Sequence, residues 1–168
     1  VLAGFSRLLI DPNRGEDDPT LVRQLYDGTV ITGNYPLTDA ERQLRLNGWF
    51  RPYHQAVACL IAEETRPGFA PFIVSIHSFT PSMQERARPW HIGLLWDRDD
   101  RATLMLLEML AMQPGLVVGD NEPYDGALRG DTMFTHAVRP GYSHVLIEIR
   151  QDLITSKAGQ DEWAERLA

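Results

Sequence analysis

Cysteine is almost absent from this sequence of 168 residues, and so is lysine. Cys59 is the only cysteine, so the chain has no internal disulfide framework, and a reducing cytoplasm is the simplest location that fits. Because Cys59 lies in an apolar helical stretch, we expect a core thiol rather than a nucleophile. Lys157 is the only lysine among 16 basic residues. The rest are arginines, which suit planar, two-point binding of carboxylates, although a biased genome composition explains the same excess.

Net positive charge and long apolar runs are also missing. The chain has 23 acidic residues against 16 basic ones, a formal net charge of −7 and a pI near 5.1. Phosphate binding needs a basic face, so nucleic acid is excluded as the main partner. No apolar run approaches the roughly 18 residues that cross a membrane, so we expect no membrane partner either. The sequence leaves the oligomeric state open.

The order of apolar segments predicts a single α/β domain over residues 1–168. A chain of this length with 43% hydrophobic residues can bury one core. Strands that alternate with helices indicate a mixed, mostly parallel sheet with helices on both faces. The expected strands are 5–11, 72–81, 91–97, 115–121 and 143–152, and the expected helices are 38–65, 99–113 and 153–168. Val1 lies inside what reads as a continuing strand, so we expect an N-terminal part of the domain to lie upstream of it.

The helix expected over 38–65 has clear start and break signals. Thr38 and Glu41 form a capping box, and Gly48 and Pro52 are expected to kink or divide the helix. The apolar residues recur near helical spacing, which predicts that one face packs on a core. They are Leu44, Trp49, Tyr53, Val57, Leu60 and Ile61.

His77 and Glu148 are polar residues in two strands that we expect to be buried. His77 follows an apolar run and is either a packed structural imidazole or a metal ligand. Because HxxH, HExxH and CxxC motifs are missing, no single segment contains a complete zinc site. Glu148 is flanked by apolar residues, where an unpaired carboxylate is costly. It is either half of a buried ion pair, with Arg150 or Arg139, or a general base that acts on water.

The stretch from Arg7 to Arg14 carries candidates for binding an anion. Arg7 in a strand and Arg14 on the following loop can converge on one carboxylate, and Asn13 can add a directional hydrogen bond. The alternative is an Asx turn over residues 11–13 with both arginines at the surface. In an α/β sheet, ligands bind beyond the carboxyl ends of the strands, which is where we expect these residues.

Three further histidines rank lower as site residues. His54 falls in the middle of a helix and is expected to be structural. His91 begins a strand and can face either way. His136 and Arg139 lie in a loop that precedes the last strand, where either can line a pocket.

Six stretches taken together resemble the N-formylglutamate amidohydrolase family. They are SRLLIDPNR, YHQAV, SIHSFTP, RPWHIGLLWDRD, GDNEPYDG and HVLIEIRQDLI. They follow the family's order and span nearly the whole chain, so the combination is more specific than any single stretch. The resemblance implies a zinc-dependent amide hydrolase with a phosphorylase/hydrolase-like α/β fold, akin to zinc carboxypeptidases and aspartoacylases.

The same resemblance implies a catalytic group. His77 matches a zinc ligand of the family, and Glu148 matches the glutamate that activates the zinc-bound water. One zinc ion is therefore expected. Because zinc held by one histidine alone would be too weakly bound to persist, we expect its other ligands upstream of Val1.

The resemblance also implies a substrate pocket. Asn13 and Arg14 match the pair that holds a substrate carboxylate, and Arg7 matches an upstream arginine of the same pocket. Arg139 and Arg150 fall in family-like motifs without firm roles, and we include both among the expected substrate-binding residues.

The sequence thus predicts hydrolysis of a small N-acyl amino acid, with N-formyl-L-glutamate cleaved to formate and glutamate, as in histidine degradation. The enzymatic alternatives are a related N-acyl amino acid deacylase and a carboxypeptidase-like hydrolase. The alternative from another class is a non-catalytic module that binds a dicarboxylate through its arginines and lacks the metal.

Overall fold

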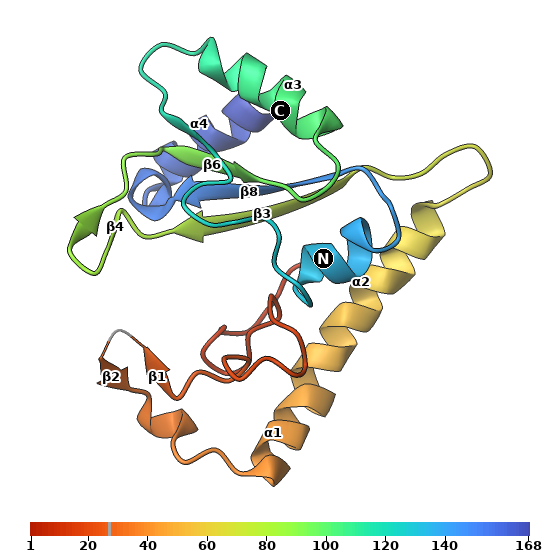
Figure 1. The fold of residues 1–168 in the computed structure, drawn as a ribbon, viewed down its shortest axis with the longest axis vertical. Coiled ribbons are helices and arrows are strands. Elements are labelled where there is room, and N and C mark those ends of the chain that lie inside the picture. The colour runs from red at the N-terminus through yellow and green to blue at the C-terminus, as the bar shows by residue number, and fades with distance from the viewer. Residues whose placement is uncertain (27) are drawn as a thin grey trace. The chain divides into compact units, whose positions relative to one another are not determined.

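The computed structural model describes residues 1–26 and 28–168, and the chain forms two compact units. Unit 1 comprises Val1–Pro71 and Leu128–Tyr142, and unit 2 comprises Phe72–Ala127 and Ser143–Ala168. The elements of both are labelled in Figure 1. No helix in the part of the chain that the structure describes is long and apolar enough to cross a membrane.

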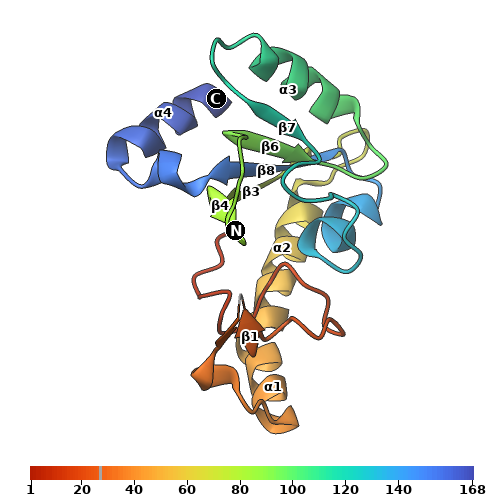
Figure 2. The same cartoon turned by 60° about the vertical axis from the view of Figure 1, so that its left-hand side comes forward.

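Unit 2 is built on a four-stranded mixed sheet (Figures 1 and 2). In sheet order its strands are β3 (Ile73–Phe79), β8 (His144–Arg150), β6 (Ile92–Leu95) and β7 (Val118–Asp120). The β3–β8 and β6–β7 pairs are parallel, and β6 runs antiparallel to β8. The predicted α/β class with a mixed, mostly parallel sheet is confirmed.

Two helices of unit 2, α3 (Arg101–Ala111) and α4 (Lys157–Leu167), pack on the sheet through one apolar cluster. Alternate residues of β6 and β8 share a face, and this face meets Leu110 of α3 and Trp163 of α4. The full cluster is Ile92, Leu94, Leu110, Val145, Ile147, Ile149 and Trp163. Glu148 lies between Ile147 and Ile149 and therefore points to the opposite face of the sheet.

Two short hairpins were not expected from the sequence. They are formed by β1 (Leu25–Tyr26) with β2 (Thr29–Val30), and by β4 (Ser82–Met83) with β5 (Arg86–Ala87). Strands of two residues are too short to show alternation of apolar and polar positions. The β4–β5 turn uses positive φ angles at Gln84 (49°) and Glu85 (62°), positions where a sequence signal would normally be Gly or Asn.

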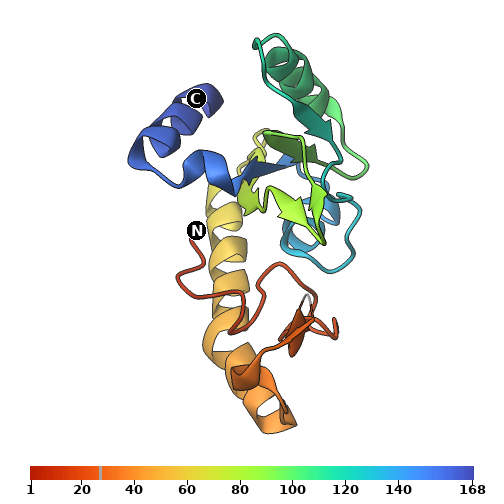
Figure 3. The same cartoon turned by 90° about the vertical axis from the view of Figure 1, so that its left-hand side faces the viewer.

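The long helix of unit 1 is divided in the middle, as the sequence predicts (Figure 3). It runs as α1 (Asp39–Arg45), a π-helical turn η2 (Leu46–Phe50) and α2 (Arg51–Glu64), and the Thr38–Glu41 capping box is present. Pro52 has no N–H to donate to Gly48, and its ring crowds that carbonyl. The wider turn, in which Arg51 N–H bonds the Leu46 carbonyl, accommodates this.

The predicted core face of this helix is wrong in part. Leu44 is 66% exposed and Leu60 43% exposed, and Cys59 is exposed rather than a core thiol. The buried helical residues are instead Leu46 and Phe50 of the π-helical turn. They complete a small cluster with residues of the N-terminal loop, which are Ile10, Leu21 and Val22. The extra residue in the turn shifts the helical register, so a uniform 3.6-residue period selects the wrong face.

Residues 5–11 form turns instead of the predicted strand. Leu9 N–H donates to the Ser6 carbonyl at 2.9 Å, which closes a turn. The loop is secured by Arg45 of α1, whose Nη1 donates to the Leu9 carbonyl at 2.9 Å. Asn34 adds a hydrogen bond from Nδ2 to the Leu8 carbonyl at 2.8 Å. Side chains satisfy this backbone in place of a neighbouring strand, and an apolar run alone does not distinguish the two cases.

Candidate functional site

His77 and Glu148 are neighbours in the sheet of unit 2. His77 of β3 is the register partner of Glu148 of β8, and Glu148 is in turn the partner of Gly93 in β6. Gly93 is paired with Gly119 of β7. Register partners project from the same face of a sheet, with strands about 4.8 Å apart. An imidazole, a carboxylate and two glycines thus form one row across the sheet, which we call the Glu148 row.

Glu148 is buried, with 6% of its surface exposed, and the flanking Ile147 and Ile149 are buried too. The predicted burial of this carboxylate is confirmed. The predicted burial of β3 is wrong, because β3 lies at the edge of the sheet and leaves Val74 and Ile76 46% and 64% exposed. His77 is half-buried, and its Nε2 lies 2.9 Å from the hydroxyl of Ser75 on the same face. Ser75 lies two positions before His77 and therefore shares its face of the strand, whereas Ser78 points to the other face.

The two glycines of the Glu148 row give room for the loop after β7. A Cβ at position 93 would overlap the carbonyl oxygen of Glu122 and lie 3.3 Å from Pro123 Cδ, and a Cβ at 119 would lie 2.7 Å from Glu122 Cβ. The backbone of Glu122 therefore lies directly on the sheet beside Glu148. Asn121 holds the loop, since its Oδ1 accepts hydrogen bonds from Trp96 N–H (3.0 Å) and Gly126 N–H (3.2 Å).

Gly93→Ala is expected to destabilise the protein by about 3 kcal/mol, because the added methyl group forces the Glu122 backbone off a fully packed surface. Urea unfolding followed by circular dichroism measures the change. Gly33→Ala is the matched control, since a Cβ there meets nothing within 4 Å. A Gly93→Ala variant as stable as the control would contradict the close packing of the loop.

Arg150 at the end of β8 donates within unit 2. Its Nε contacts Asp152 Oδ1 at 2.8 Å, and its Nη1 lies 3.3 Å from the carbonyl oxygens of both Pro89 and Trp90. These contacts clamp the segment before β6 to the end of β8. Arg150 is the predicted substrate-binding residue that lies in unit 2, and its donors already have partners within that unit.

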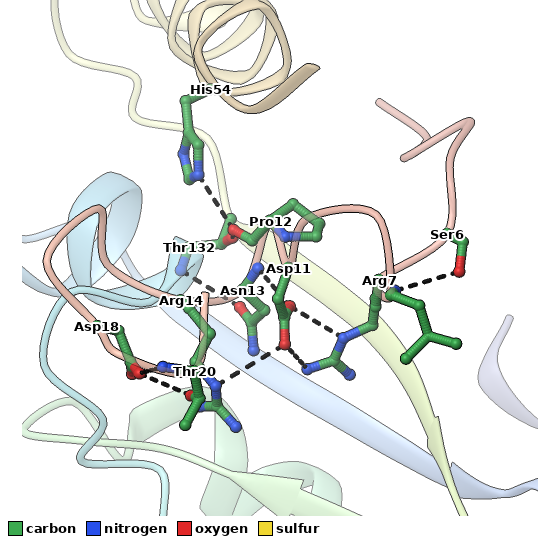
Figure 4. A network of polar contacts seen from close by, with 11 residues as sticks. Ser6, Arg7, Asp11, Pro12, Asn13, Arg14, Asp18, Thr20, His54 and Thr132 are labelled. Carbon is green, nitrogen blue, oxygen red and sulfur yellow. Dashed lines mark hydrogen bonds and ion pairs between the residues drawn. The ribbon is translucent and has the colours of Figure 1, made fainter. Parts of the chain in front are cut away.

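Arg7 and Arg14 of unit 1 converge on a carboxylate that belongs to the chain itself (Figure 4). Arg7 contacts Asp11 with two parallel bonds, Nε to Oδ1 at 2.9 Å and Nη2 to Oδ2 at 2.8 Å. Arg14 Nε lies 3.8 Å from Asp11 Oδ2. The Asp11 side chain is only 2% exposed. The convergence was predicted, but Asp11 was not recognised as its centre, although it lies four residues after Arg7 and three before Arg14.

Asn13 is oriented by its neighbours. Its backbone N–H donates to Asp11 Oδ1 at 2.9 Å, so the Asx turn proposed as an alternative is present together with the arginine cluster. Its side-chain Oδ1 accepts from the backbone N–H of Thr132 at 3.2 Å. Because a backbone N–H can only donate, the Nδ2 group must face away from Thr132. Neither Asn13 Nδ2 nor the terminal nitrogens of Arg14 donate to any residue that the structure describes.

His54 and His136 form a pair in unit 1. His54 Nδ1 lies 2.8 Å from His136 Nε2, and His54 Nε2 lies 3.0 Å from the Pro12 carbonyl. Burial lowers the pKa of His54, and burial followed by the charges of His54 and Arg139 lowers the pKa of His136 to about 4. Both imidazoles are therefore neutral at pH 7. Arg139 follows the π-helical turn η3 (Phe134–Val138), and its N–H bonds the Phe134 carbonyl.

The lowered pKa values predict that the protein loses stability in acid. A histidine has a pKa near 6.5 when unfolded, so below that pH the unfolded chain binds more protons than the folded one. The contribution of these two histidines to the free energy of unfolding is fully present above about pH 6.5 and decreases as the pH falls towards about 4. At pH 5 the contribution of His136 is about 1 kcal/mol after allowance for its partial exposure. Urea titrations at pH 7 and pH 5 should show this part of the loss disappear in His136→Gln, and an unchanged pH dependence would contradict it.

The described residues do not complete a metal site by themselves. Within 1–26 and 28–168 there is no group of three or more His, Cys, Asp or Glu side chains that could hold a metal ion. A zinc site needs at least three protein ligands. The Glu148 row supplies one imidazole and one carboxylate, so this ligand set alone does not fit zinc.

The chain is similar to solved structures, two of which are described here. A crystal structure of a gene product from Agrobacterium tumefaciens has 36% sequence identity and a TM-score of 0.88, and the match covers 97% of this chain and 65% of that one. The crystal structure of N-formylglutamate amidohydrolase from Ralstonia eutropha has 26% identity and a TM-score of 0.64, covering 89% of this chain and 63% of the other. The chain thus spans less than two thirds of the length of these relatives.

A search of curated proteins gives no match. The family model described as N-formylglutamate amidohydrolase, however, matches residues 1–155, which include the Glu148 row and the arginine cluster around Asp11. The match confirms the resemblance read from the sequence. The chain belongs to the N-formylglutamate amidohydrolase family.

Proposed function

We propose that the protein hydrolyses the amide bond of an N-acyl amino acid, with N-formyl-L-glutamate as the leading substrate and formate and glutamate as products. The observation that carries the proposal is the register pairing of His77 with the buried Glu148 in one row of the sheet. Family membership and the name of the Ralstonia eutropha relative support the choice of substrate.

Glu148 is the general base in this proposal. Its carboxylate takes a proton from the attacking water as the water oxygen bonds to the formyl carbon. The proton is then passed to the amine nitrogen as the carbon–nitrogen bond breaks, so that the amino group leaves neutral. A carboxylate in apolar surroundings suits this work, because hydration does not compete for its lone pairs.

Asn13 and Arg14, with Arg7, bind substrate carboxylates in this proposal. Arg14 offers terminal nitrogens beside Asp11, since its Nε lies 3.8 Å from Asp11 Oδ2. Asn13 offers Nδ2, because its Oδ1 accepts from the Thr132 N–H. Arg7 donates to both carboxylate oxygens of Asp11 and so fixes its orientation. The negative charge of Asp11 offsets the repulsion between the two guanidinium groups. A guanidinium and an amide fixed in advance bind a carboxylate with less loss of side-chain entropy.

A zinc cofactor is also part of the proposal. His77 would supply one imidazole to the ion, which polarises the amide carbonyl and activates water in hydrolases of this kind. Since the described residues hold fewer than three such ligands, we derive no catalytic step through the metal.

Formate release from N-formyl-L-glutamate tests the function directly, with purified full-length protein assayed with added zinc and after chelation. Turnover that depends on zinc is expected, and a protein that releases no formate overturns the proposal. A substrate panel that varies the acyl group and removes the side-chain carboxylate separates this activity from other deacylases and from carboxypeptidase-like cleavage.

A dicarboxylate-binding module without catalysis is the second candidate. It is favoured by the arginine cluster, which is complete within unit 1 and involves no metal ligand. Metal analysis of the full-length protein distinguishes the two. Glutarate binding by a metal-free protein that hydrolyses nothing would establish the module.

A further inference from the structure

We propose that His54 and His136 are positioning residues that hold the anion-binding segment Asp11–Arg14 in place through the carbonyl group of Pro12. The inference rests on the proposed function of that segment, because it assigns a purpose to contacts made behind Asn13 and Arg14. It deepens that proposal by naming residues that touch neither substrate nor reacting atoms.

The peptide group between Pro12 and Asn13 is fixed at both of its polar atoms. Its carbonyl oxygen accepts from His54 Nε2 at 3.0 Å and from the hydroxyl of Thr132 at 2.9 Å. Its N–H donates to Asp11 Oδ1 at 2.9 Å. Pro12 and Asn13 are buried, so water cannot replace these partners at low cost. A peptide plane held on both sides fixes the direction in which the Asn13 side chain leaves the backbone.

The hydrogen bonds determine the tautomers of both imidazoles. The Pro12 carbonyl can only accept, so His54 must carry its proton on Nε2. A neutral His54 then has a lone pair on Nδ1, and His136 must donate to it from its own Nε2 at 2.8 Å. The direction of donation runs from His136 to His54 and on to Pro12.

His54 alone would not be a fixed donor to the Pro12 carbonyl, and His136 supplies what is missing. An isolated neutral imidazole populates both tautomers, and the one protonated on Nδ1 would present a lone pair to the Pro12 carbonyl. The hydrogen bond from His136 selects the productive tautomer. The His54 ring is held in turn by Phe50, with ring centroids 4.3 Å apart, and by the edge of Tyr53 at 5.3 Å. The donor to Pro12 is therefore fixed in both position and chemistry.

Two substitutions at position 54 test the role. His54→Phe keeps the packing against Phe50 but removes the donor, and we expect KM for N-formyl-L-glutamate to rise about 10-fold with kcat within a factor of three, as for the loss of one buried hydrogen bond. His54→Gln carries an amide N–H in place of Nε2–H and should restore KM to within about threefold of wild type. His136→Phe, which leaves His54 in place, should give an intermediate KM. Equal KM values for His54→Phe, His54→Gln and wild type would overturn the proposal.

A second readout does not depend on activity. Nitrogen-15 NMR of the full-length protein at pH 7 should show His54 and His136 neutral and protonated on Nε2. The amide proton of Thr132, which is bonded to Asn13 Oδ1, should exchange faster in His54→Phe and in His136→Phe but not in His54→Gln. Wild-type protein that hydrolyses nothing would overturn the proposed function alone, whereas wrong tautomers or unchanged Thr132 exchange would overturn the positioning role alone.

Discussion

Glu148→Gln is expected to lower kcat for N-formyl-L-glutamate hydrolysis by about 10³-fold, which is the typical contribution of a general base. The amide has the shape of the carboxylate but cannot take a proton from water. Glu148 is 6% exposed and lies between His77 and Gly93 in register. A base from the solvent therefore cannot easily reach the position of Glu148 and take the proton in its place.

The measurement is a steady-state assay of formate release, with metal content and glutarate binding determined on the same samples. Both of these should be unchanged in Glu148→Gln, because the substitution preserves shape and removes only the proton acceptor. Glu165→Gln on α4 is the matched control, since this exposed carboxylate lies outside the Glu148 row and activity should stay at the wild-type level. Activity of Glu148→Gln within a factor of ten of wild type would remove Glu148 from its role.

The sheet of unit 2 could be predicted because its strands carry strong apolar patterns. The run Val145–Ile149 identifies a buried strand without any knowledge of its neighbours. The run Ile73–Ile76 identifies a strand but not its burial, since Val74 and Ile76 are 46% and 64% exposed at the edge of the sheet. The pairing of His77 with Glu148 could not be derived in this way. Register depends on which strands become adjacent, and a shift by one residue would place the two side chains on opposite faces.

The glycines of the Glu148 row show a related limit. In the sequence, Gly93 and Gly119 read only as weak points within strands. The structure gives them a purpose, which is to admit the Glu122 backbone beside Glu148. A contact between a strand and a distant loop leaves no periodic signal, so glycine at such a position can be interpreted only after the fold is known.

Unit 1 was harder to predict because side chains rather than a sheet organise it. The stretch from Arg7 to Asp11 has the apolar content of a strand, yet Arg45 and Asn34 satisfy its backbone and it forms turns. The candidate residues Arg7, Asn13 and Arg14 were proposed from the sequence, and their role in substrate binding stays a prediction. Thr132, which orients Asn13 from far along the chain, carries no sequence signal of its own.

Arg14→Met is expected to raise KM for N-formyl-L-glutamate by about 100-fold, since a hydrogen bond to a charged group contributes about 1.5–3 kcal/mol and each 1.4 kcal/mol is a factor of ten. The side chain is 21% exposed, and its Nε lies 3.8 Å from Asp11 Oδ2. Methionine keeps the length and apolar contacts of the stem but loses every donor. Arg14→Lys should recover only part of the loss, because an ammonium group cannot bind a carboxylate through two parallel bonds.

KM from the formate assay and the Kd of glutarate from calorimetry should rise together, since both report carboxylate binding. Arg66→Met is the matched control in the same unit, because this arginine is exposed and lies apart from the cluster around Asp11. Kcat should change much less than KM, because Arg14 binds a part of the substrate that does not react. A reversed pattern, with KM constant and kcat reduced, would place Arg14 at the reacting carbonyl instead of the carboxylate and would require the roles of Arg7 and Arg14 to be reassigned.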